Sequence, residues 1–341
     1  MSVPKIVAAA TAIPRFRWDQ EMVLRRAGYD DLTRTGFFAN SQIEARYLYM
    51  DPATFTPDES VDQLNDRFRR GAIEIGAAAA SRVLERAGWA PADVDFLATT
   101  TCTGRICPSL DAHLIRELGL KPRVQRVHVG DTGCASAMVA LQQCSNHLQA
   151  FPRHRAVLVA VEICSAAYYH DDRLESAVAH AIFADGAGAI ALSCEEDGPG
   201  IIEHRTLFRS EHLPAMGFEY PGGRPRVVLS KEVRRIGATM MKEMAETLMA
   251  SQGLKKEDIR HFILHSAGRR VIEQARKLMD LGEGDIAPSR HVLRHFGNMS
   301  SATVVFVLDE VLRGAQPAPG NWGLMIALGP GFAAEGALLR W

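Results

Sequence analysis

The chain has 341 residues, 47% of them apolar, and its 39 Lys and Arg residues balance 40 Asp and Glu residues to a net charge of -1. This composition is that of a globular protein with room for one large core or two medium ones, and it excludes a disordered chain. The basic residues are scattered and form no stripe, so neither nucleic acid nor an anionic membrane surface is an expected partner.

Two further features indicate where the protein resides. The apolar stretches are interrupted by Arg, Asp or Gly well before the roughly 18 residues that a membrane-spanning helix needs, and no secretory signal precedes the first apolar run, residues 3–12. The cysteines lie in apolar or strand-like contexts, too far apart for a short zinc-binding pattern; they are Cys102, Cys107, Cys134, Cys144, Cys164 and Cys194. We therefore expect a cytoplasmic protein without a transmembrane helix or a metal site.

A helix, a short loop and a buried strand occur twice along the chain, at an offset of 165 positions. The first copy is a helix predicted over 77–88 and a strand that ends at Thr100. The second copy is a helix predicted over 240–253 and a strand that ends at His265. An internal repeat of this kind indicates a duplicated fold.

A small-residue turn that leads into an apolar helix is also repeated, at an offset of 167 positions, over 130–141 and 297–308. This second match aligns Cys134 with Ser301. It places Cys134 and Asn298 at the starts of equivalent helices, and the duplication predicts that two such halves face each other.

Further along each half, a buried strand (156–161 and 323–328) is followed by a Gly-rich apolar segment. Short apolar strands that alternate with helices predict an α/β architecture with a central sheet in each half. The stretch 203–231 is rich in Gly and Pro and is predicted to be a linker with an irregular loop. The predicted halves are residues 1–215, which carry Cys134, and 216–341, which carry His265 and Asn298.

Cys134, His265 and Asn298 together suggest acyl transfer. A thiol at a helix N-terminus is favoured as thiolate by the helix dipole and by free backbone N–H groups. Each residue also has a plainer interpretation: Cys134 as a small buried apolar residue, His265 as a core histidine and Asn298 as a helix cap. The helix-start turn and the duplication favour the catalytic interpretation.

Several motifs narrow the class. They are Ser41-Gln42-Ile43-Glu44-Ala45-Arg46-Tyr47, Thr100-Thr101-Cys102-Thr103-Gly104, Ile182-Phe183-Ala184-Asp185-Gly186, Gly297-Asn298-Met299-Ser300-Ser301-Ala302 and Leu328-Gly329-Pro330-Gly331-Phe332. As a set, over residues 5–341, they resemble the thiolase-like condensing enzymes and, within them, type III polyketide synthases of the chalcone synthase kind. The resemblance implies a thiolase-like fold, two duplicated α/β halves packed as a layered αβαβα sandwich, and a homodimer.

The resemblance also implies a reaction. Cys134 would carry a starter acyl group as a thioester, while His265 and Asn298 stabilise the enolate formed when a malonyl unit loses CO2. A His paired with the Cys would also lower the pKa of the thiol. Repeated decarboxylative Claisen condensation and cyclisation would give a phenolic or pyrone product, from acyl-CoA and malonyl-CoA, with no bound cofactor.

Other functions are weighed beside this one. The closest alternative is a single-condensation or acyl-transfer enzyme resembling ketoacyl synthase III that acts on carrier-bound chains. A papain-like thiol hydrolase also has Cys, His and Asn in this order, but Ala135 stands where those enzymes have a Trp. A non-catalytic partner subunit would typically lack the nucleophile.

By the same resemblance, Phe183 and Val227 occupy the two gate positions at the cavity, and Val227 predicts a wider mouth. The other expected substrate-binding residues are Cys102, Cys164, Ser300, Gly329, Pro330 and Gly331.

Plant members of the family bind the phosphates of coenzyme A through a basic cluster, whose positions here hold Thr33, Gly36 and Asn40. Arg34, Arg269 and Arg270 are therefore the expected coenzyme A ligands, or else the donor arrives on an acyl carrier protein.

Overall fold

The computed structural model describes residues 2–56, 59–314 and 317–341. Its strands are β1 (Lys5–Ala12), β2 (Arg17–Asp19), β3 (Ala45–Tyr47), β4 (Phe96–Thr101), β5 (Gln125–Gly130), β6 (Arg155–Ile163), β7 (Asp185–Ser193), β8 (Gly200–Phe208), β9 (Met216–Glu219), β10 (Arg226–Leu229), β11 (Ile259–Leu264), β12 (Trp322–Gly329) and β13 (Ala333–Arg340). Its helices are α1 (Gln20–Ala27), α2 (Leu32–Ala39), α3 (Val61–Ala87), α4 (Leu110–Leu118), α5 (Ser136–Ala150), α6 (Leu174–Ile182), α7 (Val233–Ser251), α8 (Arg269–Leu278), α9 (Ala287–Phe296) and α10 (Thr303–Gly314).

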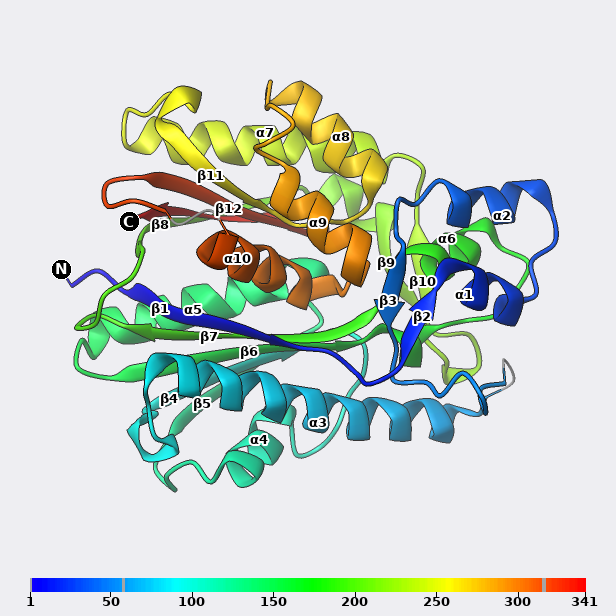
Figure 1. Cartoon of the computed structure of the whole chain (residues 1–341), viewed down its shortest axis with the longest axis horizontal. Helices are drawn as coiled ribbons and strands as arrows, with labels where there is room; N and C mark the ends of the chain where they lie inside the picture. Colours follow the sequence, from blue (N-terminus) through cyan, green and yellow to red (C-terminus); the bar gives the residue numbers. More distant parts are fainter. Residues whose placement is uncertain (1, 57–58, 315–316) are drawn as a thin grey trace.

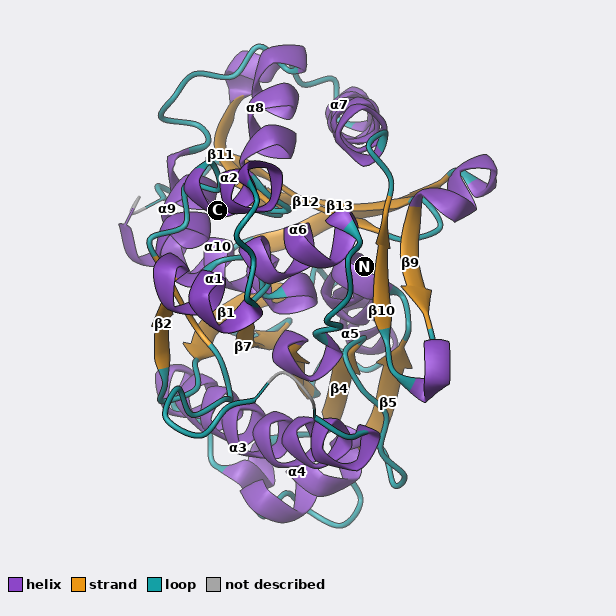
Figure 2. Ribbon diagram, turned by 90° about the vertical axis from the view of Figure 1, so that its right-hand side faces the viewer, coloured by secondary structure: helices purple, strands orange, loops and turns teal. Residues whose placement is uncertain are grey.

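The layers follow the predicted order α, β, α, β, α (Figure 1). Helices α3 and α4 cover the outer face of strands β1, β7, β6, β4 and β5, and α7 and α8 cover the outer face of β8, β13, β12 and β11. Helices α5 and α10 lie between the two sets of strands and contact both. Figure 2 shows the same stack from the side, with α7 and α8 at one extreme and α3 and α4 at the other.

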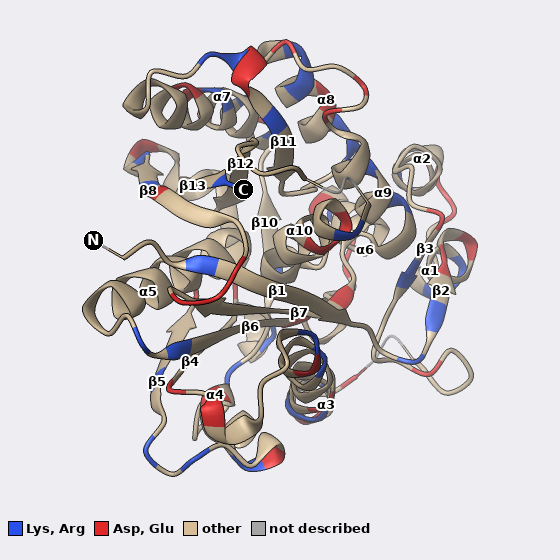
Figure 3. Ribbon diagram, turned by 60° about the vertical axis from the view of Figure 1, so that its left-hand side comes forward, with Lys and Arg blue, Asp and Glu red and all other residues tan. Residues whose placement is uncertain are grey.

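The sequence predicts a central sheet in each half, but the strands do not form two separate sheets. Within the described residues, nine strands form one sheet in the order β11-β12-β13-β8-β1-β7-β6-β4-β5. The two sets of strands join at a single residue pair, Lys5 of β1 with Gly200 of β8. Strands β6 and β7 are buried on both faces, which explains their almost continuous apolar sequence. Figure 3 shows charged residues mainly on the helices and loops around these strands.

The duplication is confirmed in detail. A 3-10 turn over Gly133–Ala135 leads into α5, and a 3-10 turn over Ser300–Ala302 leads into α10. Cys134 and Ser301 are the middle residues of these two turns, as the offset of 167 predicts. Strands β4 and β11 are also equivalent. Strand β4 pairs in parallel with β6 in the first half, and β11 pairs in parallel with β12 in the second.

The prediction of an irregular linker over 203–231 is wrong for much of that stretch. Residues up to Phe208 belong to β8, which pairs with β13 along its whole length, and β9 pairs with β10 as a hairpin. Gly and Pro dominate the prediction, and most of them occupy the turn between β9 and β10, but Pro214 lies in a 3-10 helix and Gly217 in β9 itself. The division at residue 215 stays a prediction, although β8 precedes it in the chain and pairs with strands of the second half.

Candidate active site

Cys134 lies in the 3-10 turn directly before α5, partly exposed to a cavity. Its Sγ is 3.1 Å from the Oγ of Ser300, which lies in the equivalent turn before α10. Ser300 has a left-handed backbone, with φ 47°, although it is not a glycine. Such a conformation is costly for serine and is found where the surroundings hold the backbone in place. The two turns that the duplication aligns therefore meet at one point.

The turn of Cys134 is fixed by close packing against the loop after β12. A β-carbon on Gly329 would lie 2.8 Å from the Thr132 carbonyl oxygen and 2.9 Å from the Ala135 β-carbon. Gly133 has φ 63°, and a β-carbon there would overlap Pro330 Cδ. Neither position has room for a side chain, so the two segments determine each other's place.

We expect Gly133→Ala to destabilise the protein and to prevent acylation of Cys134, because alanine must push Pro330 or the Cys134 turn aside. The matched control is Gly119→Ala, since Gly119 has the same φ of 63° but no neighbouring atom within 4 Å of the place that a β-carbon would take. Both variants carry about 1 kcal/mol of left-handed strain, and only Gly133→Ala carries the overlap. Thermal unfolding and intact-mass measurement of acylation would compare them; equal behaviour of the two variants would contradict the packing argument.

His265 follows the last residue of β11, and its N–H donates to the Ile326 carbonyl oxygen of β12 (2.9 Å). Its side chain is buried, with 1% of its surface exposed. Neither ring nitrogen has a hydrogen-bond partner within the described part of the chain. Burial lowers the pKa of His265 to about 4, because it disfavours the charged imidazolium. A neutral ring with one donor and one acceptor nitrogen is thus available to a substrate.

The pKa of Cys134 runs against the prediction from the sequence. Burial raises the pKa of the thiol to about 12, although hydrogen bonds from Ser300 and from the backbone N–H of Cys134 act in the opposite direction. Neither ring nitrogen of His265 is hydrogen-bonded to Cys134 or to any other described residue. Within the described residues, burial therefore opposes the thiolate, and the role of His265 in lowering the pKa of Cys134 stays a prediction.

Asn298 lies just before the turn that leads into α10 and ties this turn to the segment after His265. Its side-chain Nδ2 donates to the Ala267 carbonyl oxygen (3.2 Å), two residues beyond His265. Its Oδ1 accepts from the Ser300 N–H (2.9 Å) and from the Thr303 hydroxyl (3.3 Å) at the start of α10. Asn298 thus caps the turn before α10, and one N–H of its amide remains for a substrate.

The cavity beside Cys134 has a volume of ≈ 50 Å³. The predicted residues that line it are Phe183, Val227, Cys102, Cys164, Ser300 and Pro330. Gly329 and Gly331 do not line it: Gly329 packs under the Cys134 turn, and Gly331 packs against Phe208. The cavity is small, and the wider mouth expected from Val227 stays a prediction.

Sequence reasoning missed the hairpin that narrows this cavity. Met216 and Phe218 of β9 face Leu229 and Val227 of β10 as cross-strand pairs, and all four line the cavity. Two short runs of β-forming residues around Tyr220-Pro221-Gly222-Gly223 are the pattern of a hairpin, and that pattern could have predicted it.

Glu162 was also missed. This fully buried carboxylate of β6 accepts hydrogen bonds from the Cys102 N–H (3.1 Å), the Thr103 hydroxyl (2.8 Å) and the Ser301 hydroxyl. Burial raises the pKa of Glu162. The Sγ of Cys102 in turn lies 3.1 Å from Ser300 Oγ. A lone glutamate inside the apolar run of β6 was the sequence signal, because a buried carboxylate needs such donors.

A second, wider cavity of ≈ 620 Å³ adjoins the first, and Leu229 lines both. Ile182 and Ala267, whose carbonyl oxygens accept from Asn298, also line it. We name it the entrance cavity. Gly36 of α2 and Asn40, which caps the end of α2, form one wall, at the positions where the resemblance places the basic cluster of plant members.

The opposite wall of the entrance cavity is basic: Lys231, Arg234, Arg269 and Arg270 line it, with Glu175 as the acidic neighbour. None of these four cations has an ion-pair partner in residues 2–56, 59–314 and 317–341. Arg34, the third predicted ligand, lies elsewhere, where it pairs with Asp31 (2.8 Å) and donates to the Asp172 carbonyl oxygen.

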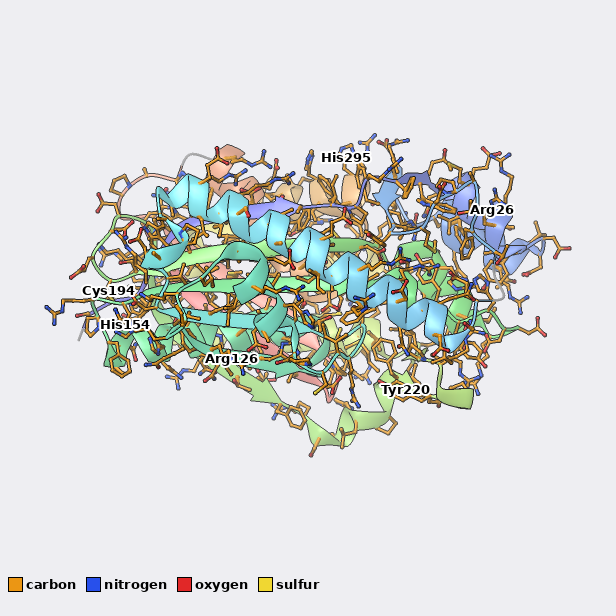
Figure 4. The ribbon with its side chains drawn as sticks, turned by 90° about the horizontal axis from the view of Figure 1, so that it is seen from below. Arg26, Arg126, His154, Cys194, Tyr220 and His295 are labelled. Carbon is orange, nitrogen blue, oxygen red and sulfur yellow. The ribbon has the colours of Figure 1, made fainter. Side chains whose placement is uncertain are left out.

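The remaining cysteines lie away from Cys134. Cys144 is buried in α5, Cys107 is exposed, and Cys194 lies at one end of the molecule, where Figure 4 labels it. Across the described residues, no group of His, Cys, Asp and Glu is arranged to hold a metal ion. No helix in the same residues is both long and apolar enough to cross a bilayer.

Two duplicated halves, with a cysteine and an asparagine at the mouths of their paired central helices, define a thiolase-like condensing enzyme, which transfers acyl groups. A family model described as "FAE1/Type III polyketide synthase-like protein" matches residues 49–265. The chain belongs to this family of type III polyketide synthases.

Individual relatives agree. The chain is 32% identical to a 3,5-dihydroxyphenylacetyl-CoA synthase of Streptomyces toyocaensis, over 99% of this chain and 90% of the relative. It is 30% identical to a 1,3,6,8-tetrahydroxynaphthalene synthase of Streptomyces peucetius subsp. caesius, over 98% and 93%. Among solved structures, PKS-I from the brown alga Ectocarpus siliculosus matches with a TM-score of 0.92 and 28% identity, over 99% of this chain and 98% of that one.

The alternative of a ketoacyl synthase III-like enzyme on carrier-bound chains is not supported. A family model described as "3-Oxoacyl-[acyl-carrier-protein (ACP)] synthase III C terminal" does match residues 249–341. That segment is only part of the second half of the fold, whereas the longer match and the relatives named above are polyketide synthases.

Proposed function

We propose that the protein loads a starter acyl group on Cys134, extends it with malonyl units and releases a cyclised phenolic or pyrone product. The observation that carries the proposal is a chain of contacts: Cys134 touches Ser300, and the N–H of Ser300 donates to Asn298. Asn298 in turn donates to the Ala267 carbonyl oxygen, two residues beyond His265, whose ring nitrogens are unpaired in the described chain. The names of the two bacterial relatives, a dihydroxyphenylacetyl-CoA synthase and a tetrahydroxynaphthalene synthase, support a polyhydroxylated aromatic product.

In the loading step, neutral His265 takes the proton of the Cys134 thiol while the sulfur attacks the thioester carbonyl of the starter. The carbon–sulfur bond to the carrier thiol then breaks, and that thiol leaves with the proton. A thiol whose pKa is raised by burial needs such a base at the moment of attack.

In the extension step, the malonyl thioester loses CO2, and its electrons move to the thioester oxygen as an enolate. The free N–H of Asn298 and the N–H of His265 donate to that oxygen, and fixed donors of this kind stabilise developing charge without reorganisation. The enolate carbon attacks the acyl group on Cys134, a carbon–carbon bond forms, the carbon–sulfur bond to Cys134 breaks, and Cys134 leaves as a thiolate.

The donor is a coenzyme A thioester. The basic wall of the entrance cavity offers four cations without ion-pair partners in the described chain, next to the carbonyl groups that hold Asn298. Phosphates are bound by such groups, and Arg269 and Arg270 take this role together with Lys231 and Arg234. Arg34 is not included, because its guanidinium is already paired.

We expect Arg269→Ala and Arg270→Ala to raise the KM for malonyl-CoA by roughly tenfold each, since a charge-assisted hydrogen bond contributes about 1.5–3 kcal/mol. The KM for malonyl-pantetheine, which lacks the nucleotide phosphates, should not change. Arg235→Ala is the matched control, because Arg235 is exposed and pairs with Glu232. An equal rise of KM for both thioesters would contradict phosphate binding at this wall.

Product analysis tests the whole proposal. Incubation with malonyl-CoA and a panel of acyl-CoA starters should yield products with two or more added two-carbon units, detected by mass spectrometry. Products with a single added unit would overturn the polyketide synthase reaction.

We also propose a cytoplasmic homodimer. Its support is β5, which forms the edge of the nine-stranded sheet in the described chain and carries exposed residues. An unpaired edge invites a strand from a second copy. Sedimentation analysis would measure the mass in solution.

A further inference from the structure

Arg46 is fully buried and lies below the cavity, outside the chemistry described above. Its Nη1 donates to the carbonyl oxygens of His180 (2.6 Å) and Phe183 (2.9 Å), and its Nη2 donates to the Gln20 side chain. No carboxylate pairs with it among the described residues, although its exposed fraction is 0%. A buried arginine that bonds mainly to backbone oxygens fixes the backbone it touches.

Tyr168 donates to the same carbonyl oxygen. Its hydroxyl is 2.8 Å from the Phe183 oxygen, while its ring forms part of the cavity wall beside Cys134. The Phe183 carbonyl therefore accepts two buried hydrogen bonds, one from a cation and one from a phenol. The side chain of Phe183 lines the cavity of Cys134.

The segment held in this way is bonded to Asn298. The Asn298 N–H donates to the Ile182 oxygen (2.9 Å), and the Ala184 N–H donates to the Asn298 oxygen (2.8 Å), so Phe183 and Asn298 form an isolated parallel bridge. At Gly297, next to this bridge, the packing is too close for a side chain. A β-carbon there would lie 3.1 Å from the Ile182 oxygen and 3.5 Å from the Arg46 β-carbon.

We propose that Arg46 and Tyr168 are positioning residues that set two parts of the site through one carbonyl group. They fix the Phe183 ring at the cavity, and through the bridge they fix the backbone of Asn298. The proposal deepens the function proposed above and rests on it for its effect on substrate choice.

Tyr168→Phe tests the proposal with least disturbance, because it keeps the ring in the cavity wall and removes only the donor. Tyr29→Phe is the matched control. The Tyr29 hydroxyl makes a hydrogen bond of the same length, 2.8 Å, and also partly buried, to His180 Nδ1, but none to Phe183. Thermal unfolding would show whether the two variants lose similar stability.

The first readout is hydrogen exchange of the peptides that contain Ala184 and Asn298. Tyr168→Phe should speed exchange of both amides relative to Tyr29→Phe, because the bridge then loses one of its two anchors. Equal exchange in the two variants overturns the proposal, whether or not the protein accepts any thioester. Arg46→Lys, which cannot reach both carbonyls and Gln20 at once, should speed exchange further.

The second readout is the ratio of kcat/KM for hexanoyl-CoA and acetyl-CoA as starters. Tyr168→Phe should change this ratio by about threefold to tenfold, the range of one lost buried hydrogen bond. In a Phe183→Ala background the change should vanish, because Tyr168 acts through that ring. A change of the same size in that background would mean that Tyr168 contacts the substrate directly, and it would overturn the proposal. Failure of the wild-type chain to use either starter would count against the proposed function alone.

Discussion

Replacing Cys134 with alanine should abolish the mass gain that the wild-type chain shows after incubation with acyl-CoA starters. The expected effect is complete, because no other group in the proposed reaction forms the thioester. Cys134 lies in the turn that opens α5, where backbone N–H groups and the helix dipole favour developing negative charge on sulfur. Intact-protein mass spectrometry measures the loss directly and identifies which donors are used.

The cavity provides its own controls, because Cys102 and Cys164 line it together with Cys134. Burial and the charge of Glu162 raise the pKa of Cys102, as they also raise that of Cys134, but Cys102 follows β4 and has no helix N-terminus to stabilise its thiolate. The pKa of Cys164 is raised for the same two reasons. Cys102→Ala and Cys164→Ala should therefore keep the mass gain. A gain that survives in Cys134→Ala but disappears in either control would move the nucleophile to the other thiol.

The approach of the Cys134 turn to the turn that follows Asn298 could be predicted from the sequence, because the duplication is visible as repeated spacing along the chain. Buried strands such as β6 and β12 are short apolar runs, and small-residue turns mark the starts of α5 and α10. Equal spacing in two halves then requires equivalent turns, and two facing halves bring those turns together. Ser300, 3.1 Å from Cys134, is the contact that results.

The narrowness of the cavity could not be predicted in the same way. It depends on the hairpin of β9 and β10, whose Gly and Pro residues suggest a loop and whose strands are only four residues long. The side chains of Phe218 and Met216 enter the cavity because the hairpin folds over it, which is a tertiary arrangement without a local pattern. Val227 alone suggested a wider mouth.

The electrostatics of the site were equally beyond a sequence argument. The helix dipole and a nearby His both favour a thiolate, and both are visible as a pattern, whereas the loss of hydration is not. In the structure the loss of hydration sets the direction of both pKa shifts, since burial raises the pKa of Cys134 to about 12 and lowers that of His265 to about 4. The sequence predicts only two residues of the basic wall, Arg269 and Arg270. Lys231 and Arg234 are distant in sequence and come beside them only when the chain folds.

Replacing Asn298 with alanine should lower malonyl-CoA decarboxylation by about 100-fold or more, the usual effect of removing one fixed donor from a developing oxyanion. Loading of Cys134 should fall by less than about tenfold, since that step uses His265 and the helix N-terminus. Release of CO2 from malonyl-CoA and the rate of mass gain with a starter measure the two steps separately.

Asn298 is also a helix cap, so alanine alone cannot separate the two roles. Asn298→Asp can, because aspartate keeps an oxygen to accept the Ser300 N–H and the Thr303 hydroxyl, but it has no N–H to give to the substrate. If the N–H group of Asn298 acts on the substrate, the decarboxylation rate falls in both variants, whereas only Asn298→Ala also loosens the start of α10. If Asn298 serves only as a cap, Asn298→Asp keeps its decarboxylation rate, and the stabilisation of the enolate must then come from His265 alone.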